Sequence, residues 1–304
     1  MRVLVTGGAG FIGSHIVEHF HSTHEVLVLD NLRSGYRRNL EGLKHSFHEI
    51  SVTDPEALPP LFEGVDMVFH LAALVSVPES MLQPAECVRI NTQGTLNVLE
   101  AARRGGVKAL VFASSAAVYG DNPVVPKVET MLPEPKSPYA VTKLDGEYYL
   151  RIFAGQWGLK AAALRFFNVF GPRQDPGSQY AAAVPIFIRR ALRGEDLVIY
   201  GDGSQVRDFI YVKDVVAACL LAAEHGGEVR NVARGEHITI LQLARLILEL
   251  TGSNSKIVYA EPRPGDVHTS YADTARIREL GFTPSADLQG NLLATIRFFE
   301  EREK

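Results

Sequence analysis

Six apolar runs with the character of β-strands alternate with amphipathic stretches along the chain up to residue 168. The runs are RVLVTGG, HEVLVLD, SFHEIS, DMVFHLAA, KALVFASS and AAALRFFN, and the intervening stretches predict helices over residues 11–22, 55–62, 84–104 and 137–158. This alternation is typical of a parallel sheet covered by helices on both faces. With right-handed crossovers it predicts a doubly wound α/β fold of the Rossmann type, which binds ligands at the carboxyl ends of its strands.

The chain changes character after residue 171, where loops rich in proline, glycine and aspartate separate shorter helices. We expect residues 1–168 to form the Rossmann domain and residues 169–304 to form mainly a smaller C-terminal α/β domain that binds substrate. Two later segments, RDFIYV and VRNVA, also have strand character. We therefore expect part of residues 205–235 to return to the first sheet.

The composition favours small ligands over macromolecular partners. The 304 residues carry a formal net charge of −4 and a pI near 6.2, which gives no general attraction for nucleic acid or acidic membranes. No apolar stretch approaches the about 20 residues that span a bilayer, and the chain starts directly with a strand, so we expect a cytoplasmic protein. We expect no metal site, because His15 and His19 lie one helical turn apart without a third ligand.

A glycine-rich turn, TGGAGFIG at residues 6–13, lies between the first strand and the first helix. Gly7, Gly10 and Gly13 form the pattern of a dinucleotide site there, because a pyrophosphate approaches a helix N-terminus closely only where no Cβ intervenes. Asp30 ends the second strand, where a carboxylate binds both hydroxyls of an adenosine ribose and repels a 2′-phosphate. We therefore predict NAD as the cofactor, although Arg33 nearby could accept that phosphate of NADP.

Ser115, Tyr139 and Lys143 form a candidate catalytic set. Ser115 ends the strand KALVFASS, and the tyrosine and lysine of SPYAVTK share one face of a helix. A tyrosine must lose about three pKa units to act as a base at neutral pH, which costs about 4 kcal/mol. One ammonium about 4 Å away supplies about that much at an effective dielectric constant of about 20. The set therefore predicts alcohol oxidation, with Tyr139 as the base, Ser115 bonded to the reacting hydroxyl and Lys143 tuning the base.

Eight motifs, in order along essentially the whole chain, resemble those of the extended short-chain dehydrogenase/reductase family: TGGAGFIG, DNLRSG, HLAA, SSAAVYG, YAVTK, LRFFNVFGP, GDGSQVRDFIYV and RPGD. Within it, the chain is similar to nucleotide-sugar 4-epimerases of the UDP-galactose 4-epimerase type. The resemblance implies that Tyr139 takes the C4 hydroxyl proton while the C4 hydride passes to retained NAD. The 4-keto sugar then rotates and takes the hydride back on its other face. It also implies a homodimer joined through the helices over 84–104 and 137–158.

The same resemblance implies positions for both ligands. For NAD they are Gly7, Gly10, Phe11, Ile12, Gly13, Asp30, Asn31, Ser34, Gly35, Leu71, Ala72, Ala73, Asn91, Tyr139, Lys143 and Phe166, with Ser51 and Val52 at the adenine. For the UDP-sugar they are Ser76, Ser115, Asn168, Ala183, Val184, Val198, Tyr200, Arg207, Arg263, Asp266 and Ser270. Two arginines among these, Arg207 and Arg263, would neutralise the diphosphate, and Asp266 would bind the uridine ribose.

Departures from the family pattern narrow the prediction. Ser51 and Val52 stand where relatives hold the adenine with an acidic and an apolar residue. Ala116 and Ala117 stand where relatives that dehydrate or decarboxylate their sugars have acidic residues, which favours epimerisation. Ser270 is small at a wall position that is bulky in enzymes limited to glucose and galactose. We therefore expect UDP-glucose and UDP-galactose, and also the N-acetylated pair, as substrates; a UDP-glucuronate 4-epimerase or a non-catalytic NAD-binding sensor remain alternatives.

Overall fold

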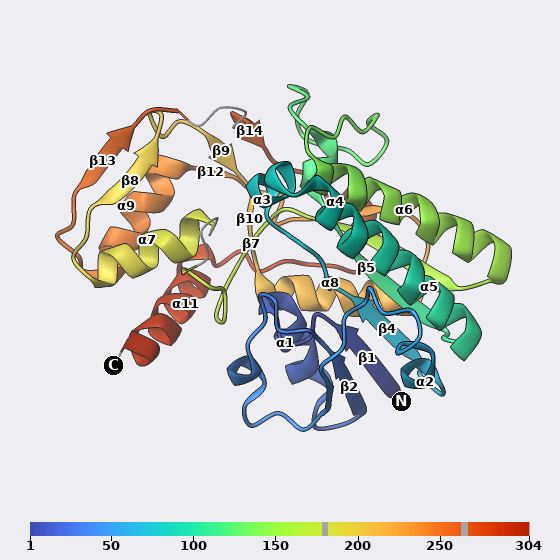
Figure 1. Ribbon diagram of the computed structural model, residues 1–304. Helices are drawn as coiled ribbons and strands as arrows, with labels where there is room; N and C mark the ends of the chain where they lie inside the picture. The colour runs from blue at the N-terminus through green and yellow to red at the C-terminus, as the bar shows by residue number, and fades with distance from the viewer. Residues whose placement is uncertain (178–181, 263–266, 304) are drawn as a thin grey trace.

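The computed structural model describes residues 1–177, 182–262 and 267–303 of the chain. Seven parallel strands form the central sheet of the larger lobe (Figure 1). In spatial order they are β11 (Arg230–Val232), β6 (Lys160–Phe166), β5 (Ala109–Ser115), β4 (Met67–His70), β1 (Arg2–Thr6), β2 (Glu25–Leu29) and β3 (Ser46–His48). The winding direction reverses between β1 and β4, which places a ligand crevice at their carboxyl ends. The predicted doubly wound α/β fold is confirmed.

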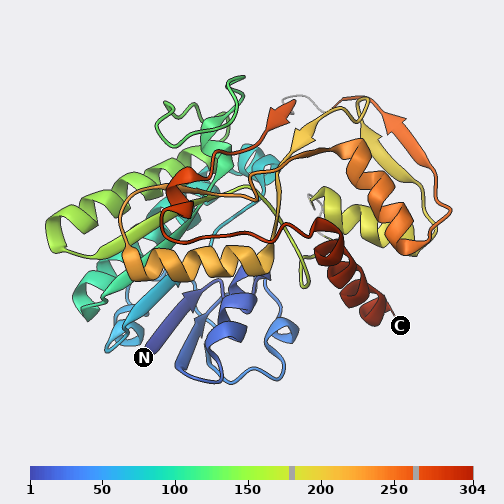
Figure 2. The ribbon, with the colours of Figure 1, turned by 180° about the vertical axis from the view of Figure 1, so that it is seen from behind.

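Helices cover both faces of this sheet because its central strands bury side chains on both sides. On β1, Val3 and Val5 pack into one apolar cluster and Leu4 into another. The first cluster includes α1 (Phe11–Phe20) and α8 (Val212–His225), and the second includes α5 (Gly94–Gly105) and α6 (Pro138–Trp157). Figures 1 and 2 show α8 on the face opposite α5 and α6.

Shorter helices connect these layers: η1 (Arg37–Leu40), α2 (Pro59–Phe62), α3 (Val77–Leu82), α4 (Pro84–Cys87), η2 (Val88–Gln93) and η3 (Ala116–Tyr119). Two of them differ from the expectation. The helix expected over 55–62 begins only at α2, because the Asp54 carboxylate accepts bonds from the backbone N–H groups of Glu56 and Ala57 and forms a turn there. The long helix expected over 84–104 passes through a π-helical stretch at η2.

The smaller lobe is built on β8 (Leu197–Tyr200) and β13 (Ile257–Ala260), which pair in parallel. They pack in one apolar cluster with α7 (Ala183–Leu192), α9 (Ile240–Thr251) and α11 (Leu288–Glu303), and the lobe stands to one side of the large sheet (Figure 1). A third sheet consists of β12 (Ile238–Thr239), β9 (Val206–Arg207) and β14 (Thr269–Ser270). The short helix α10 (Ala275–Arg278) follows it. Across all described residues, no helix has both the length and the apolar character needed to cross a membrane.

The chain crosses between the lobes more than once. The segment VRNVA contributes β11, which pairs with β6 at the edge of the large sheet. RDFIYV instead contributes the end of β9 and then β10 (Phe209–Tyr211), and β10 pairs with β7 (Asn168–Phe170) in a separate two-stranded sheet. In the large sheet, the position beside β6 belongs to β11. These crossings bring β7, β9 and β10 between the two lobes (Figure 1).

Candidate active site

The glycine-rich turn brings α1 against β1 with no room for side chains. Gly7 has φ +70°, and a Cβ there would lie 2.8 Å from the backbone nitrogen of Ala72. A Cβ on Gly13 would overlap the carbonyl oxygen of Gly7. Gly10 precedes α1, and no side chain caps that helix N-terminus. Because Phe11 and Ile12 open the helix with N–H groups that no side chain covers, this turn fits the diphosphate of a dinucleotide.

Asp30 follows β2 and is buried against the same turn. Its Oδ2 accepts a hydrogen bond from the Ala9 N–H (3.0 Å), and its Oδ1 accepts one from the Leu32 N–H (2.8 Å). Burial raises the pKa of Asp30, and these two hydrogen bonds oppose the rise. Gly35 lies against this carboxylate, since a Cβ there would be 2.9 Å from Oδ2. A carboxylate has further lone pairs, so the site fits the hydroxyls of a ribose; Asn31 and Ser34 lie in the same loop.

The segment that follows β4, Leu71 to Ala73, returns to the end of β1. The Leu71 N–H donates to the Thr6 carbonyl (3.1 Å), and the Ala72 N–H donates to the Thr6 hydroxyl (3.3 Å). His70 lies between Thr6 Oγ1 (2.7 Å) and Thr95 Oγ1 (3.0 Å). Burial lowers the pKa of His70 to about 3, so the ring is neutral at physiological pH. His70 therefore fixes the strands around the site rather than acting as a proton donor.

Asn91 lies in the π-helical η2 and uses its whole amide within the protein. Its Oδ1 accepts from the Leu74 N–H (2.7 Å), and its Nδ2 donates to the Leu74 carbonyl (3.0 Å) and to Thr142 Oγ1 (3.0 Å). Thr142 directly precedes Lys143 on α6. The expected cofactor residue Asn91 thus fixes the loop after β4 against the helix that carries the candidate base.

The residues expected at the adenine, Ser51 and Val52, lie in the loop after β3. Ser51 Oγ and Thr53 Oγ1 lie 2.8 Å apart. Val52 is buried, and its carbonyl accepts from Asn97 Nδ2 (2.9 Å). A Cβ on Gly94 would lie 2.6 Å from Val52 Cγ2, so this loop packs tightly on the start of α5.

The three candidate catalytic residues meet beyond the carboxyl end of β5. Ser115 is the last residue of β5, is paired in register with Phe166 of β6, and accepts from the Ala117 N–H (3.1 Å). Tyr139 lies in the first turn of α6, which Ser137 caps by accepting from the Ala140 N–H. Lys143 lies one turn later, with Nζ 5.8 Å from the centre of the Tyr139 ring.

The pKa shifts of Tyr139 and Lys143 differ from those expected from their spacing alone. Burial raises the pKa of Tyr139, and hydrogen bonding with Ser115 opposes the rise. Burial also lowers the pKa of Lys143 to about 8, and its Nζ donates to the Ala113 carbonyl (2.7 Å). The expected lowering of the Tyr139 pKa by Lys143 is therefore not found within the chain itself, where the cost of burying the phenolate dominates the shift. A positively charged nicotinamide ring would act in the opposite direction to burial.

Three of the expected substrate residues lie close together. Ser270 of β14 pairs in register with Arg207 of β9. Arg207 Nη1 donates to the carbonyls of Val206 (2.9 Å) and His268 (3.1 Å). Asn168, which opens β7, donates through Nδ2 to the carbonyl of Asp208 (2.9 Å), the residue after Arg207. Arg263 and Asp266 lie outside the described residues.

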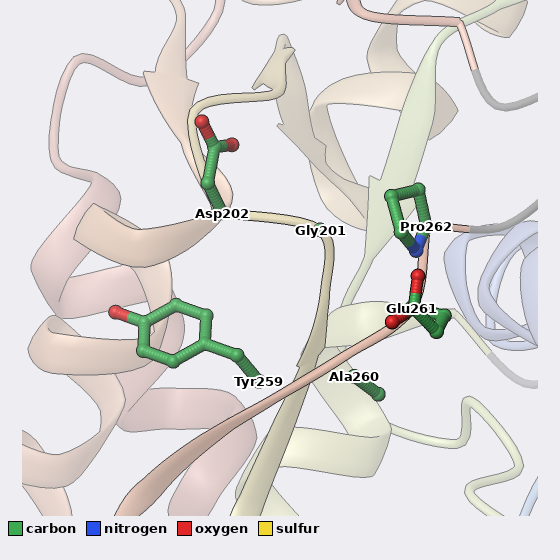
Figure 3. A pocket seen from close by; sticks show the side chains of 6 residues that line it. All are labelled: Gly201, Asp202, Tyr259, Ala260, Glu261 and Pro262. Atoms are coloured by element: carbon green, nitrogen blue, oxygen red, sulfur yellow. The ribbon is translucent and has the colours of Figure 1, made fainter.

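The other expected substrate residues are spread over both lobes. Ser76 caps α3 by accepting from the Glu79 N–H (3.1 Å). Ala183 and Val184 open α7, where Val184 is buried in the core of the smaller lobe. Val198 and Tyr200 lie on β8. Beyond Tyr200, a hollow of about 500 Å³ is lined by Gly201, Asp202, Tyr259, Ala260, Glu261 and Pro262 (Figure 3). None of the three candidate catalytic residues lines it.

The structure adds residues that the sequence analysis missed. Asp208 is buried, and its carboxylate accepts from the N–H groups of Arg234 and Gly235 (2.9 Å each), which ties the turn between β9 and β10 to the segment after β11. Burial raises the pKa of Asp208 to about 6. Beneath the catalytic set, Glu147 of α6 forms a buried ion pair with Arg165 of β6 (2.7 Å). The sequence contained a pattern that could have indicated Asp208 and Glu147. Asp208 directly follows Arg207, and Glu147 lies one helical turn after Lys143.

A parallel sheet with a glycine-rich turn, a ribose carboxylate and a serine–tyrosine–lysine set at its carboxyl edge defines a nucleotide-dependent enzyme of the Rossmann class. The model of the NAD dependent epimerase/dehydratase family matches residues 3–237, and the chain belongs to this family. This confirms the resemblance drawn from the sequence. The similar proteins described next confirm the NAD cofactor and the class of NAD-dependent isomerases.

Solved structures of similar proteins cover almost the whole chain. A UDP-glucose 4-epimerase of Thermotoga maritima, solved with UDP-glucose, is 44% identical over 100% of both chains, with a TM-score of 0.96. A UDP-N-acetylglucosamine 4-epimerase of Methanobrevibacter ruminantium is 41% identical over 99% of this chain and 98% of its own, also with a TM-score of 0.96. A Thermus thermophilus UDP-glucose 4-epimerase in complex with NAD is 40% identical over 99% of both chains, with a TM-score of 0.91.

Relatives with a different reaction reach similar identity. A UDP-N-acetyl-alpha-D-glucosaminuronate decarboxylase of Bacillus cytotoxicus is 36% identical over 99% of this chain and 98% of its own length. Overall identity therefore does not determine the substrate of this chain, and the residues of the site have to be considered as well.

Proposed function

We propose that the protein interconverts UDP-sugars that differ in configuration at C4: UDP-glucose with UDP-galactose, and also UDP-GlcNAc with UDP-GalNAc. The observation that carries this proposal is the meeting of Ser115, Tyr139 and Lys143 at the end of β5, followed by Ala116 and Ala117. Elimination and decarboxylation need a further acid or base at the sugar, and these two alanines provide none. Similarity to epimerases that act on glucose and on N-acetylglucosamine supports both sugar pairs.

The cofactor residues divide by the part of NAD that each would hold. The turn from Gly7 to Gly13 would bind the diphosphate, and Asp30 the adenosine ribose. Lys143 would bind the nicotinamide ribose as well as act on Tyr139. When bound, NAD supplies a hydride acceptor that takes the C4 hydride and returns it to the opposite face, so no net oxidation occurs.

The chain's own residues move one proton in each direction. The Tyr139 phenolate takes the proton of the C4 hydroxyl as the C4 carbonyl forms, while the Ser115 hydroxyl bonds to the same oxygen. After the 4-keto sugar turns over, Tyr139 returns the proton to that oxygen. Lys143 is charged at pH 7, below its pKa of about 8, and its charge favours the phenolate.

The substrate residues would hold the nucleotide so that only the sugar turns. Arg207, with Arg263, would bind the diphosphate, and Asp266 the uridine ribose. We place the base against Val198, Tyr200 and the start of α7. We also propose that residues 1–168 form the cofactor domain and that residues 169–304 form mainly the substrate domain. The protein would be a homodimer in the cytoplasm.

The test is a coupled assay of the purified protein without added NAD on UDP-glucose, UDP-galactose, UDP-GlcNAc and UDP-GalNAc. Interconversion should fall by about 10²- to 10⁴-fold in Tyr139→Phe, which keeps the ring but removes the proton-transfer group. The Tyr148→Phe variant, on the exposed part of the same helix, serves as the matched control and should retain turnover. No turnover of any of the four sugars, with NAD still bound, would contradict the proposal and favour a uronate substrate or a sensor.

A further inference from the structure

The loop after β2 carries a cation, Arg33, three residues beyond the ribose carboxylate of Asp30. Its guanidinium is engaged by two carboxylates from the helices that follow β4. Nη2 lies 2.9 Å from Glu79 Oε1 on α3, and Nη1 lies 3.4 Å from Glu86 Oε1 on α4. The backbone of Arg33 is also fixed, because its N–H donates to Asn31 Oδ1 (3.2 Å).

Glu86 is shared with a second arginine. Arg89 Nε and Nη2 lie 2.7 and 2.8 Å from the two carboxylate oxygens of Glu86, and Arg89 Nη1 donates to Thr53 Oγ1 (3.0 Å). Hydrogen bonding with Arg89 lowers the pKa of Glu86, with smaller contributions from the charges of Arg89 and Arg33. We call these four residues, Arg33, Glu79, Glu86 and Arg89, the Arg33 cluster. Its two positive and two negative charges cancel.

This cancellation bears on the choice between NAD and NADP. A 2′-phosphate would bring close to two negative charges to a ribose site whose own carboxylate, Asp30, is negative. An arginine near that ribose accommodates the phosphate in NADP-binding sites of this fold. In this chain the nearby guanidinium already pairs with two glutamates. We propose that Glu79 and Glu86 are specificity-determining residues that exclude NADP by holding Arg33 in the cluster.

The size of the effect follows from the exposure of the cluster. The Arg33 side chain is 39% exposed, so the charges of the Arg33 cluster act through a largely aqueous medium. At a dielectric constant of about 80, a unit charge about 6 Å from a doubly charged phosphate changes its affinity by about tenfold. Removing both glutamates should therefore raise the preference for NADP by about this factor, while Asp30 continues to favour NAD.

The experiment measures which nucleotide the protein retains. The full-length chain, freed of nucleotide, is incubated with equimolar NAD and NADP and desalted, and the nucleotides are then released by heat and quantified by chromatography. The retained ratio of NADP to NAD should rise about tenfold in Glu79→Gln/Glu86→Gln. Adding Arg33→Gln to that variant should return the ratio to the wild-type value. Glu100→Gln is the matched control, because Glu100 pairs with Arg103 and Arg104 on α5 in a similar exposed cluster.

Two results would overturn the inference. One is an unchanged ratio in the double variant that still retains NAD. The other is an equal rise in Glu100→Gln, which would mean that any lost surface carboxylate has this effect. The inference rests on the proposed placement of Asp30 at the adenosine ribose. The inference does not depend on the sugar reaction. If the ratio of NADP to NAD rises in the double variant while the protein converts no UDP-sugar, the proposed function is wrong and the role of Glu79 and Glu86 is still supported.

Discussion

At the scale of single residues, the pairing of Ser270 with Arg207 connects the proposed binding sites of the sugar and of the diphosphate. The two residues are partners across β14 and β9, and Asp208 follows directly with its carbonyl bonded to Asn168. The side chain at position 270 is therefore held at a fixed position relative to the proposed diphosphate arginine. Its size should decide which sugars fit beside that arginine.

Replacing Ser270 by tyrosine tests this. The larger side chain should reduce turnover of UDP-GlcNAc and UDP-GalNAc by about tenfold or more relative to UDP-glucose and UDP-galactose, because it fills the space for the acetamido group. Ser270→Ala is the control, since it keeps the space and removes only the hydroxyl. The ratio of kcat/KM values for the two sugar pairs is the measurement. An equal ratio in Ser270→Tyr and wild type would contradict the role of this position.

The order and spacing of the motifs were enough to predict that Ser115, Tyr139 and Lys143 meet at the carboxyl end of β5. They were not enough to predict the electrostatic balance. The four-residue spacing of Tyr139 and Lys143 gave their common face, but not the burial that raises the pKa of Tyr139 and lowers that of Lys143. Burial depends on contacts such as those of Cys87 and Leu74, which are distant in sequence from both.

At the scale of elements, α6 connects the catalytic edge to the interior of the sheet. Tyr139 and Lys143 lie in its first turns, and Glu147 follows one turn later. The carboxylate of Glu147 accepts two bonds from Arg165 (2.9 and 2.7 Å) and one from Ser114 (2.5 Å), the neighbour of Ser115. The ion pair is 3–4% exposed. It therefore fixes α6 against β5 and β6 from within the core.

Removing one partner of this pair should destabilise the protein strongly. Glu147→Gln leaves the Arg165 charge buried without its counter-ion, which should lower the free energy of unfolding by about 3–5 kcal/mol. Urea unfolding gives the measurement. Glu100→Gln, which breaks an exposed pair on α5, should change it by less than about 1 kcal/mol. Equal effects of the two substitutions would contradict the structural role of the buried pair.

The helices and strands were predictable wherever a regular apolar pattern extends over many residues, as in α6 and β5. Prediction failed where a single side chain redirects the backbone. Asp54 delays the start of α2 through two hydrogen bonds to the backbone. Likewise, Asn91 bonds to Leu74 from within η2, and nothing in the local pattern of residues 84–104 indicates a π-helical stretch there.

At the scale of the whole molecule, η2 and α6 both carry exposed apolar side chains. Val88, Tyr148 and Ile152 are 47%, 45% and 51% exposed. The helix expected over 84–104 also contributes Leu96 and Leu99 of α5, but these two side chains pack against the core of the larger lobe. The proposed homodimer would therefore use the first three residues.

A charge at Val88, Tyr148 or Ile152 should weaken the dimer. Tyr148→Glu places two carboxylates in a twofold contact and should raise the dissociation constant of the dimer by about tenfold or more. Tyr259→Glu is the matched control, because Tyr259 is an exposed tyrosine (57%) on the smaller lobe. Light scattering over a concentration series gives the measurement. A wild-type protein that is monomeric at all concentrations, or equal behaviour of the two variants, would contradict this interface.

β11 comes late in the sequence, and this position has a consequence for synthesis on the ribosome. Until residue 232 has emerged, β6 is an open edge whose backbone groups can pair with another chain, although all the other strands of that sheet are complete by residue 166. α8, which covers one face of the same sheet, also comes late. The nascent chain must therefore keep a nearly finished sheet from aggregating while it makes β7 to β10, and a fragment that stops at residue 168 would carry that vulnerability permanently.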